Sequence, residues 1–130
     1  MKTIKVKTPS EGMIDITQDV RQAVKESGTK SGIAYIYTPH TTAAITINEN
    51  ADPSVKKDIM LSLNSFVKEL KTFTHMEGNS TAHVKSSLIG CSSTVLIEDG
   101  DVVLGTWQGI FLCEFDGPRT RKVHIKIIKG

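Results

Sequence analysis

The sequence lacks the features that mark membrane-spanning and secreted proteins. Its longest apolar runs fall far short of the ~20 residues that cross a bilayer, so we expect no transmembrane helix and no membrane partner. The first twelve residues contain lysines but no continuous apolar region, unlike a signal peptide. Only two cysteines are present, Cys91 and Cys113, and they form no CxxC pair. We therefore expect reduced thiols and a cytoplasmic location.

The chain also carries only a small excess of positive over negative charge. Sixteen Lys and Arg against 14 Asp and Glu leave a formal net charge of +2, spread along the chain, so nucleic acid is not an expected partner. The ordinary content of 38% hydrophobic and 23% charged residues excludes disordered and collagen-like chains. Because the 130 residues contain neither repeats nor a linker, residues 1–130 are expected to form a single domain.

What the sequence does contain is a series of short strands with helices between them. Alternating or β-branched runs predict strands at residues 2–7, 13–16, 33–38, 43–49, 93–97, 102–104, 107–115 and 122–128. Helices are expected at 17–27, at 53 to about 70 after the capping pair Asp52-Pro53, and at 81–89. Residues 39–42 are expected to turn a hairpin with His40 near its tip. This order predicts an α+β fold with mainly antiparallel sheet and two to three helices.

Three of the four histidines, His40, His75 and His83, lie in polar, turn-like segments. Neutral imidazoles bind transition metals well, so convergence of the three would make a zinc-like site with an open position for water or substrate. Without a metal, the same group would serve as general acids and bases near neutral pH. The alternative is three unrelated surface histidines, because their spacing matches no standard metal motif such as HExxH.

The short helix expected at 81–89 offers an anion site. The free N–H groups of its first turn lie beside Asn79, Ser80 and Lys85, an arrangement that suits a phosphate. In the alternative interpretation Asn79 and Ser80 only cap the helix, and Lys85 is only solvated. The helix is expected to turn Val84 and Leu88 toward the core.

The strand expected at 107–115 carries Gln108 and Glu114 on the same face. Six residues separate them, about 20 Å on a regular strand, so they cannot both touch one small reacting group in the same subunit. A buried Glu114 would have a raised pKa and could act as an acid or a base. Alternatively, Arg119 and Arg121 would hold Glu114 ionised or bind an anion.

Four separated motifs occur in one order along the chain. They are YTPHTT at residues 37–42, NENADP at 48–53, HMEGNS at 75–80 with His83 following, and LGTWQGI at 104–110 with Glu114 following. Together they closely resemble the YjbQ family, also called the secondary thiamine-phosphate synthase family. The resemblance implies a compact α+β fold with β-sandwich-like sheets, assembled as a homotrimer. It also implies a shared pocket, whose matching residues here are His40, Glu49, His75, Asn79, His83, Gln108 and Glu114.

The activity associated with that family condenses a pyrimidine-methyl pyrophosphate with a thiazole phosphate and releases pyrophosphate. Positive charge for the leaving group would come from Lys85, Arg119 and Arg121, or from a divalent metal such as Zn²⁺ or Mg²⁺. The sequence has neither a carboxylate-rich Mg²⁺ motif nor a glycine-rich phosphate loop. This suits a site that supports the reaction as a secondary activity.

Two functional hypotheses follow, and both stay open at the level of sequence. In the first the protein is a modest synthase, whose catalytic candidates are His40, His83, Glu49 and Glu114, and whose phosphate-binding candidates are Asn79, Ser80, Lys85, Gln108 and Arg119. In the second it is a metal-dependent or anion-binding protein, whose partner is another small phosphorylated or anionic metabolite and whose metal ligands would be His40, His75 and His83. A structural trimer without catalysis is a third alternative.

Overall fold

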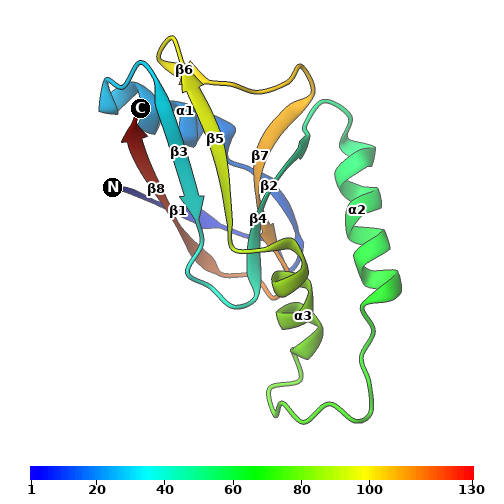
Figure 1. The fold of residues 1–130 in the computed structure, drawn as a ribbon. Coiled ribbons are helices and arrows are strands. Elements are labelled where there is room, and N and C mark those ends of the chain that lie inside the picture. Colours follow the sequence, from blue (N-terminus) through cyan, green and yellow to red (C-terminus); the bar gives the residue numbers. More distant parts are fainter.

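The computed structural model describes residues 1–130 as two antiparallel sheets and three helices (Figure 1). The larger sheet has the strand order β1 (Lys2–Lys7), β8 (Thr120–Lys129), β3 (Gly32–Tyr37), β5 (Ser92–Glu98) and β6 (Asp101–Val102). The smaller sheet has the order β2 (Gly12–Asp15), β7 (Gln108–Glu114) and β4 (Ala43–Glu49). The helices are α1 (Thr17–Ser27), α2 (Pro53–Phe66) and α3 (Ser80–Ile89). The predicted α+β class with mainly antiparallel sheet is confirmed.

The two sheets pack face to face around one apolar core. Ile36 and Ile125 of the larger sheet meet Ile45 and Leu112 of the smaller sheet, and Val20 of α1 closes the same cluster. Alternation along β7 places its other face against a second cluster beneath α2 and α3, which contains Phe111, Cys113, Met60, Leu63 and Ala82. The smaller sheet is therefore covered on both faces, which fits the nearly continuous burial of β7.

The expected hairpin between residues 33–38 and 43–49 is wrong. β3 pairs with β5 and β8, whereas β4 pairs with β7, so the chain crosses from one sheet to the other between them. Thr38 fixes the start of this crossing, because its N–H donates to Cys91 O (2.9 Å) and its hydroxyl donates to Lys122 O (3.1 Å). His40 consequently lies in a crossover between the sheets rather than at an exposed hairpin tip.

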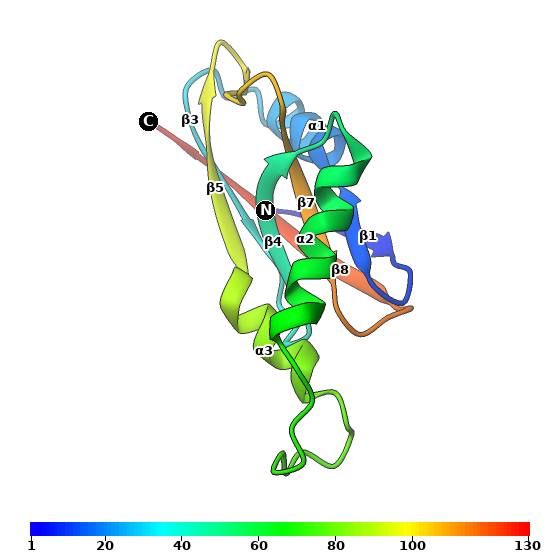
Figure 2. The same ribbon diagram turned by 90° about the vertical axis from the view of Figure 1, so that its right-hand side faces the viewer.

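Helix α2 begins where the sequence predicts. Asp52 Oδ1 accepts a hydrogen bond from Ser54 N–H (2.9 Å), and Pro53 occupies the first turn. The helix ends at Phe66, before the expected limit near residue 70, and the chain continues as the long loop visible below it (Figures 1 and 2). Figure 2 shows α2 lying over the smaller sheet, with α3 at one end of that sheet. None of the three helices is both long and apolar enough to cross a membrane.

Helix α3 buries a different face from the one expected. Val84 and Leu88 are exposed, whereas Ala82, Lys85 and Ser86 are buried. The reason is a set of contacts with other segments: Ser86 Oγ donates to the backbone oxygen of Ala43 (2.6 Å), and Lys85 Nζ donates to Asn64 Oδ1. These contacts orient α3 so that His83 faces the end of the smaller sheet where Glu114 lies.

Candidate functional site

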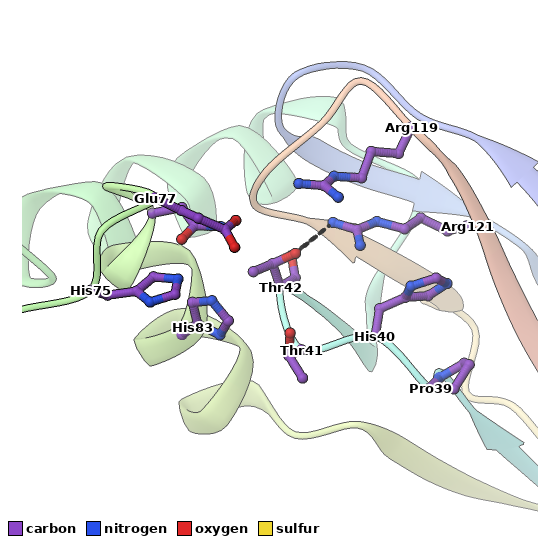
Figure 3. A pocket seen from close by; sticks show the side chains of 10 residues that line it. Pro39, His40, Thr41, Thr42, His75, Glu77, His83, Arg119 and Arg121 are labelled. Atoms are coloured by element: carbon purple, nitrogen blue, oxygen red, sulfur yellow. Dashed lines mark hydrogen bonds between the residues drawn. The ribbon is translucent and has the colours of Figure 1, made fainter.

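A polar cleft lies where three segments meet: the crossover after β3, the start of α3, and the loop from β7 into β8. Its volume is about 290 Å³, and no hydrophobic side chain lines it. The lining residues are Pro39, His40, Thr41, Thr42, His75, Glu77, Asn79, His83, Arg119 and Arg121. Figure 3 shows the guanidinium groups of Arg119 and Arg121 on one side and the rings of His75 and His83 on the other. The structure thus brings the three histidines of the sequence hypothesis to one place.

Arg121 is a buried cation that reaches this cleft. Only 2% of the residue is exposed. Its Nε donates to Glu114 Oε1 (2.8 Å), and its Nη2 donates to Glu114 Oε2 and to Thr42 Oγ1 (2.9 Å). These bonds form a fork on the carboxylate and leave Nη1 without a protein partner. A buried guanidinium with one free nitrogen at a cleft is a donor for an anionic ligand.

Glu114 is the ionised counterpart of Arg121. The carboxylate is fully buried, and besides the two bonds from Arg121 it accepts from Thr8 Oγ1 (2.5 Å) and from Asp116 N–H (3.0 Å). Burial alone would raise the pKa of Glu114, but these hydrogen bonds outweigh it and hold the pKa below its ordinary value. Glu114 is therefore a carboxylate whose oxygens are already bonded. This geometry does not support the acid–base role expected for it.

Arg119 is held beside Arg121 by Asp116. Its Nε donates to Asp116 O (2.7 Å) and its Nη2 to Asp116 Oδ2 (2.8 Å), which again leaves Nη1 without a protein partner. The same Asp116 oxygen accepts from Asn79 Nδ2 (2.8 Å), and this bond, with the charge of Arg119, lowers the pKa of Asp116. Asn79 occupies the N-cap position of α3, as expected, but its side chain makes no capping hydrogen bond. Its amide orientation is fixed by a carboxylate that can only accept, and its Oδ1 stays buried without a partner.

His40 has a defined tautomer. Its Nε2 accepts a hydrogen bond from the backbone N–H of Lys122 (2.9 Å). A backbone N–H only donates, so Nε2 carries no proton and the neutral ring carries its proton on Nδ1. Burial and the nearby charge of Arg121 lower the pKa of His40, although Glu114 partly opposes that effect. His40 is thus a neutral hydrogen-bond donor, and as it lies here it has no free lone pair for a metal ion or for a proton.

His75 and His83 lie next to each other across the cleft. Their ring centroids are 5.2 Å apart and the planes are perpendicular. No three His, Cys, Asp or Glu side chains of the chain are grouped so as to hold a metal ion. Within this subunit the three imidazoles line one cleft but are not grouped around a common point. Divalent metal binding stays a prediction.

Several residues of the sequence hypothesis lie elsewhere. Lys85 is 5% exposed and faces Asn64, away from the cleft, while Ser80 lines a neighbouring hollow with His75 and His83. Glu49 and Gln108 pair with each other at the far end of β4 and β7, whereas the cleft lies at the end where Ala43 pairs with Glu114. There Gln108 Oε1 accepts from Gly105 N–H (2.8 Å) and Glu49 Oε2 from Asp52 N–H (3.3 Å). One subunit does not bring these residues to the cleft.

The sequence did not point to Thr8, and it gave Thr42 and Glu77 only as members of the YTPHTT and HMEGNS motifs, without a role. For Arg121 the sequence left two alternatives, holding Glu114 ionised or binding an anion, and the buried ion pair with Glu114 bears out the first. One signal was available for Arg121, since it lies in alternation with Val123 and Ile125 on the buried face of β8. A charged residue on the apolar face of a strand predicts a buried partner of opposite charge.

Comparison with known proteins places this chain among a widespread group. The family model described as "UPF0047 protein YjbQ-like" matches residues 2–130. A UPF0047 protein of Methanocaldococcus jannaschii is 60% identical over 118 residues, which are 91% of this chain and 86% of that protein. UPF0047 protein YugU of Bacillus subtilis is 53% identical over 130 residues, which are 98% of each chain.

Solved structures agree with the fold. An uncharacterised conserved protein of the YjbQ/UPF0047 family from Clostridium acetobutylicum is 51% identical and superposes with a TM-score of 0.95 over 98% of this chain and 100% of that one. A protein of unknown function from Sulfolobus solfataricus, described as YbjQ-like, is 34% identical, with a TM-score of 0.93 over 99% and 96% of the two chains.

Proposed function

The chain belongs to the UPF0047 protein YjbQ-like family, and from that premise we propose that its cleft binds a small phosphorylated or anionic metabolite. In this proposal a thiamine-phosphate synthase-like condensation is a secondary activity of the same site. The observation that carries the proposal is the pair of arginines, Arg119 and Arg121, each with one guanidinium nitrogen free at a cleft without hydrophobic lining.

The donors of the cleft suit phosphate oxygens. Guanidinium N–H groups form charge-assisted hydrogen bonds with phosphate, and such bonds are about twice as strong as neutral ones. The Nδ1–H of His40 adds a neutral donor whose tautomer is fixed by Lys122. A volume of about 290 Å³ lies at the lower end of small-molecule sites, so the cleft suits one phosphorylated group rather than two complete heterocyclic substrates.

The condensation places simple demands on this site. The ring nitrogen of the thiazole phosphate forms a bond to the methylene carbon of the pyrimidine substrate as the carbon–oxygen bond breaks, and pyrophosphate leaves with the electron pair. Arg119 and Arg121 would stabilise the charge that develops on the leaving group. His75 and His83 lie within the same cleft and would be the groups that supply or accept protons.

The lining of the cleft favours binding over a dedicated synthase. Two aromatic heterocycles are normally held by apolar surface, and this cleft, which is mostly polar, offers little of it within one subunit. The homotrimer implied by the family resemblance is part of the proposal, since a partner subunit would supply additional surface. The second candidate function is therefore a binding protein for an anionic metabolite with no condensation at all.

Isothermal titration with inorganic phosphate and pyrophosphate tests the binding proposal. Arg119→Ala should weaken binding about tenfold or more, because it removes a charged hydrogen-bond donor. Arg21→Ala is the matched control: Arg21 is also a partly exposed arginine paired with an aspartate, Asp101, but it lies on α1 outside the cleft. Equal affinities for the two variants would refute the proposal.

A product assay separates the two candidate functions. The purified protein is incubated with the pyrimidine-methyl pyrophosphate and the thiazole phosphate, with Mg²⁺, with Zn²⁺ or with EDTA, and thiamine phosphate is measured by chromatography. We expect slow formation that Arg119→Ala reduces and Arg21→Ala does not. Anion binding without product above the protein-free rate would leave the binding function and remove the synthase.

A further inference from the structure

We infer that Thr8 and Glu114 are positioning residues that set the two arginines of the cleft at a fixed separation. The inference deepens the proposed anion-binding function and rests on it. Neither residue lines the cleft, so each acts through the arginines and not by touching the ligand.

Thr8 is tied to the backbone of Arg119. The threonine follows β1 and is 8% exposed. Its N–H donates to Arg119 O (2.9 Å), and its hydroxyl oxygen accepts from Arg119 N–H (3.1 Å). The single hydroxyl proton then goes to Glu114 Oε1 at 2.5 Å, the shorter of its two acceptor contacts, since Arg119 O is 3.0 Å away. One hydroxyl group therefore links the backbone that carries Arg119 to the carboxylate of Glu114.

Glu114 transmits this link to Arg121. Both carboxylate oxygens accept from Arg121, and Oε2 also accepts from the N–H of Asp116, the residue that holds the Arg119 side chain. The supports of both guanidiniums thus meet on one buried carboxylate. A rotation of Glu114 would shift Arg121 relative to Arg119, and only the hydrogen bonds from Thr8 and Asp116 oppose it from outside the arginine pair.

The affinity of a ligand that contacts both arginines depends on their separation, whereas the affinity of a ligand that contacts only one does not. Thr8→Val keeps the shape of the side chain, but it leaves one Glu114 oxygen short of a donor and the Arg119 N–H without an acceptor. The expected consequence is a loss of preference for pyrophosphate, which in this inference contacts both guanidiniums, over orthophosphate.

Calorimetric titration of the full chain with pyrophosphate and with orthophosphate tests this inference. Thr8→Val should weaken pyrophosphate binding about tenfold and orthophosphate binding no more than about threefold. Thr8→Ser, which restores the hydroxyl, should recover the preference. Thr3→Val is the matched control, because Thr3 lies on β1 and its hydroxyl bonds to His124 (2.8 Å) outside the cleft. Thr8→Ala gives the same comparison if the valine variant does not fold.

The outcomes are distinct. An equal change for both anions, or no change, overturns the inference and leaves the proposed function in place, because it would mean that Thr8 does not set the spacing. Recovery by Thr8→Ser is required, since a purely structural loss would alter the melting temperature without altering the ratio of the two affinities. If the unaltered protein binds neither anion, the proposed function fails and the inference falls with it.

Discussion

At the scale of single residues, a backbone hydrogen bond decides what His40 does. The Lys122 N–H donates to the lone pair of Nε2. Protonation of the ring at Nε2 would replace this hydrogen bond with a repulsive contact between two N–H donors. Burial and the charges of Arg121 and Arg119 act in the same direction on the pKa of His40. A residue that by type alone would be a base or a metal ligand is thereby fixed as a neutral donor.

This arrangement predicts how His40 titrates. In the free protein its pKa should lie below the ordinary value of 6.5, and saturating phosphate should raise it, because a bound anion offsets the charge of the two arginines. Since folding lowers this pKa, the contribution of His40 to stability is present above pH 6.5 and is lost as the pH falls through the folded value. NMR titration of the imidazoles measures both effects, with His40→Gln to assign the signal. A pKa above 6.5 without phosphate would contradict the prediction.

Glu77 is the negative charge that opposes an anion in the cleft. It lines the cleft, and Figure 3 shows its carboxylate on the side of His75, facing the arginines. Glu77→Gln should tighten phosphate binding about two- to fivefold, a typical effect for one partly solvated charge. Glu69→Gln, an exposed change in the same loop outside the cleft, should have no effect. Weaker binding by the Glu77 variant would mean that Glu77 assists the ligand.

At the scale of elements, the loop between β7 and β8 depends on the small size of Gly117. A Cβ at this position would lie 2.0 Å from Pro9 O and 3.0 Å from Glu114 Cγ, while the Gly117 N–H donates to Ser10 O (2.8 Å). Gly117→Ala must therefore separate this loop from the segment that carries Thr8. We expect a loss of about 1–3 kcal/mol in the free energy of unfolding, measured with urea. Gly130→Ala, with nothing within 4 Å of the added Cβ, should be neutral.

Elements set by local chemistry were predictable from sequence, and those set by distant contacts were not. The start of α2 followed from Asp52-Pro53, and the turn between β5 and β6 followed from Asp99-Gly100, whose φ angles are 52° and 78°. The end of α2 did not follow, because the helical spacing of apolar residues continues to Leu70, whereas the backbone becomes extended at Val67.

The candidate site shows the same division. The turn positions of His40, His75 and His83 indicated that these residues belong together, and they line one cleft. Thr8 and Glu114 are 106 residues apart, and no local pattern connects a threonine after the first strand with a glutamate at the end of the seventh. The sequence thus indicated which residue types surround the ligand but not which hydrogen bonds hold them.

At the scale of the whole molecule, the homotrimer remains to be tested. Leu61, Phe66 and Leu70 are each more than half exposed along α2 and the loop after it, so these apolar side chains are available for burial against a partner subunit. We expect sedimentation equilibrium at micromolar concentration to give three times the chain mass of 14.2 kDa. A species of single-chain mass would contradict the assembly, and Phe66→Glu should shift a genuine trimer toward that mass.

The strand order of the larger sheet has a consequence for biosynthesis. The strand β8 lies between β1 and β3, so the earliest strand to leave the ribosome has no partner until the last one has been translated. Arg119 and Arg121 are made at the same late stage. Until then Thr8 lacks its hydrogen-bond partner Arg119. A nascent chain that stops before residue 119 therefore has neither a complete sheet nor an anion site. The anion site therefore forms only after β8 has been made.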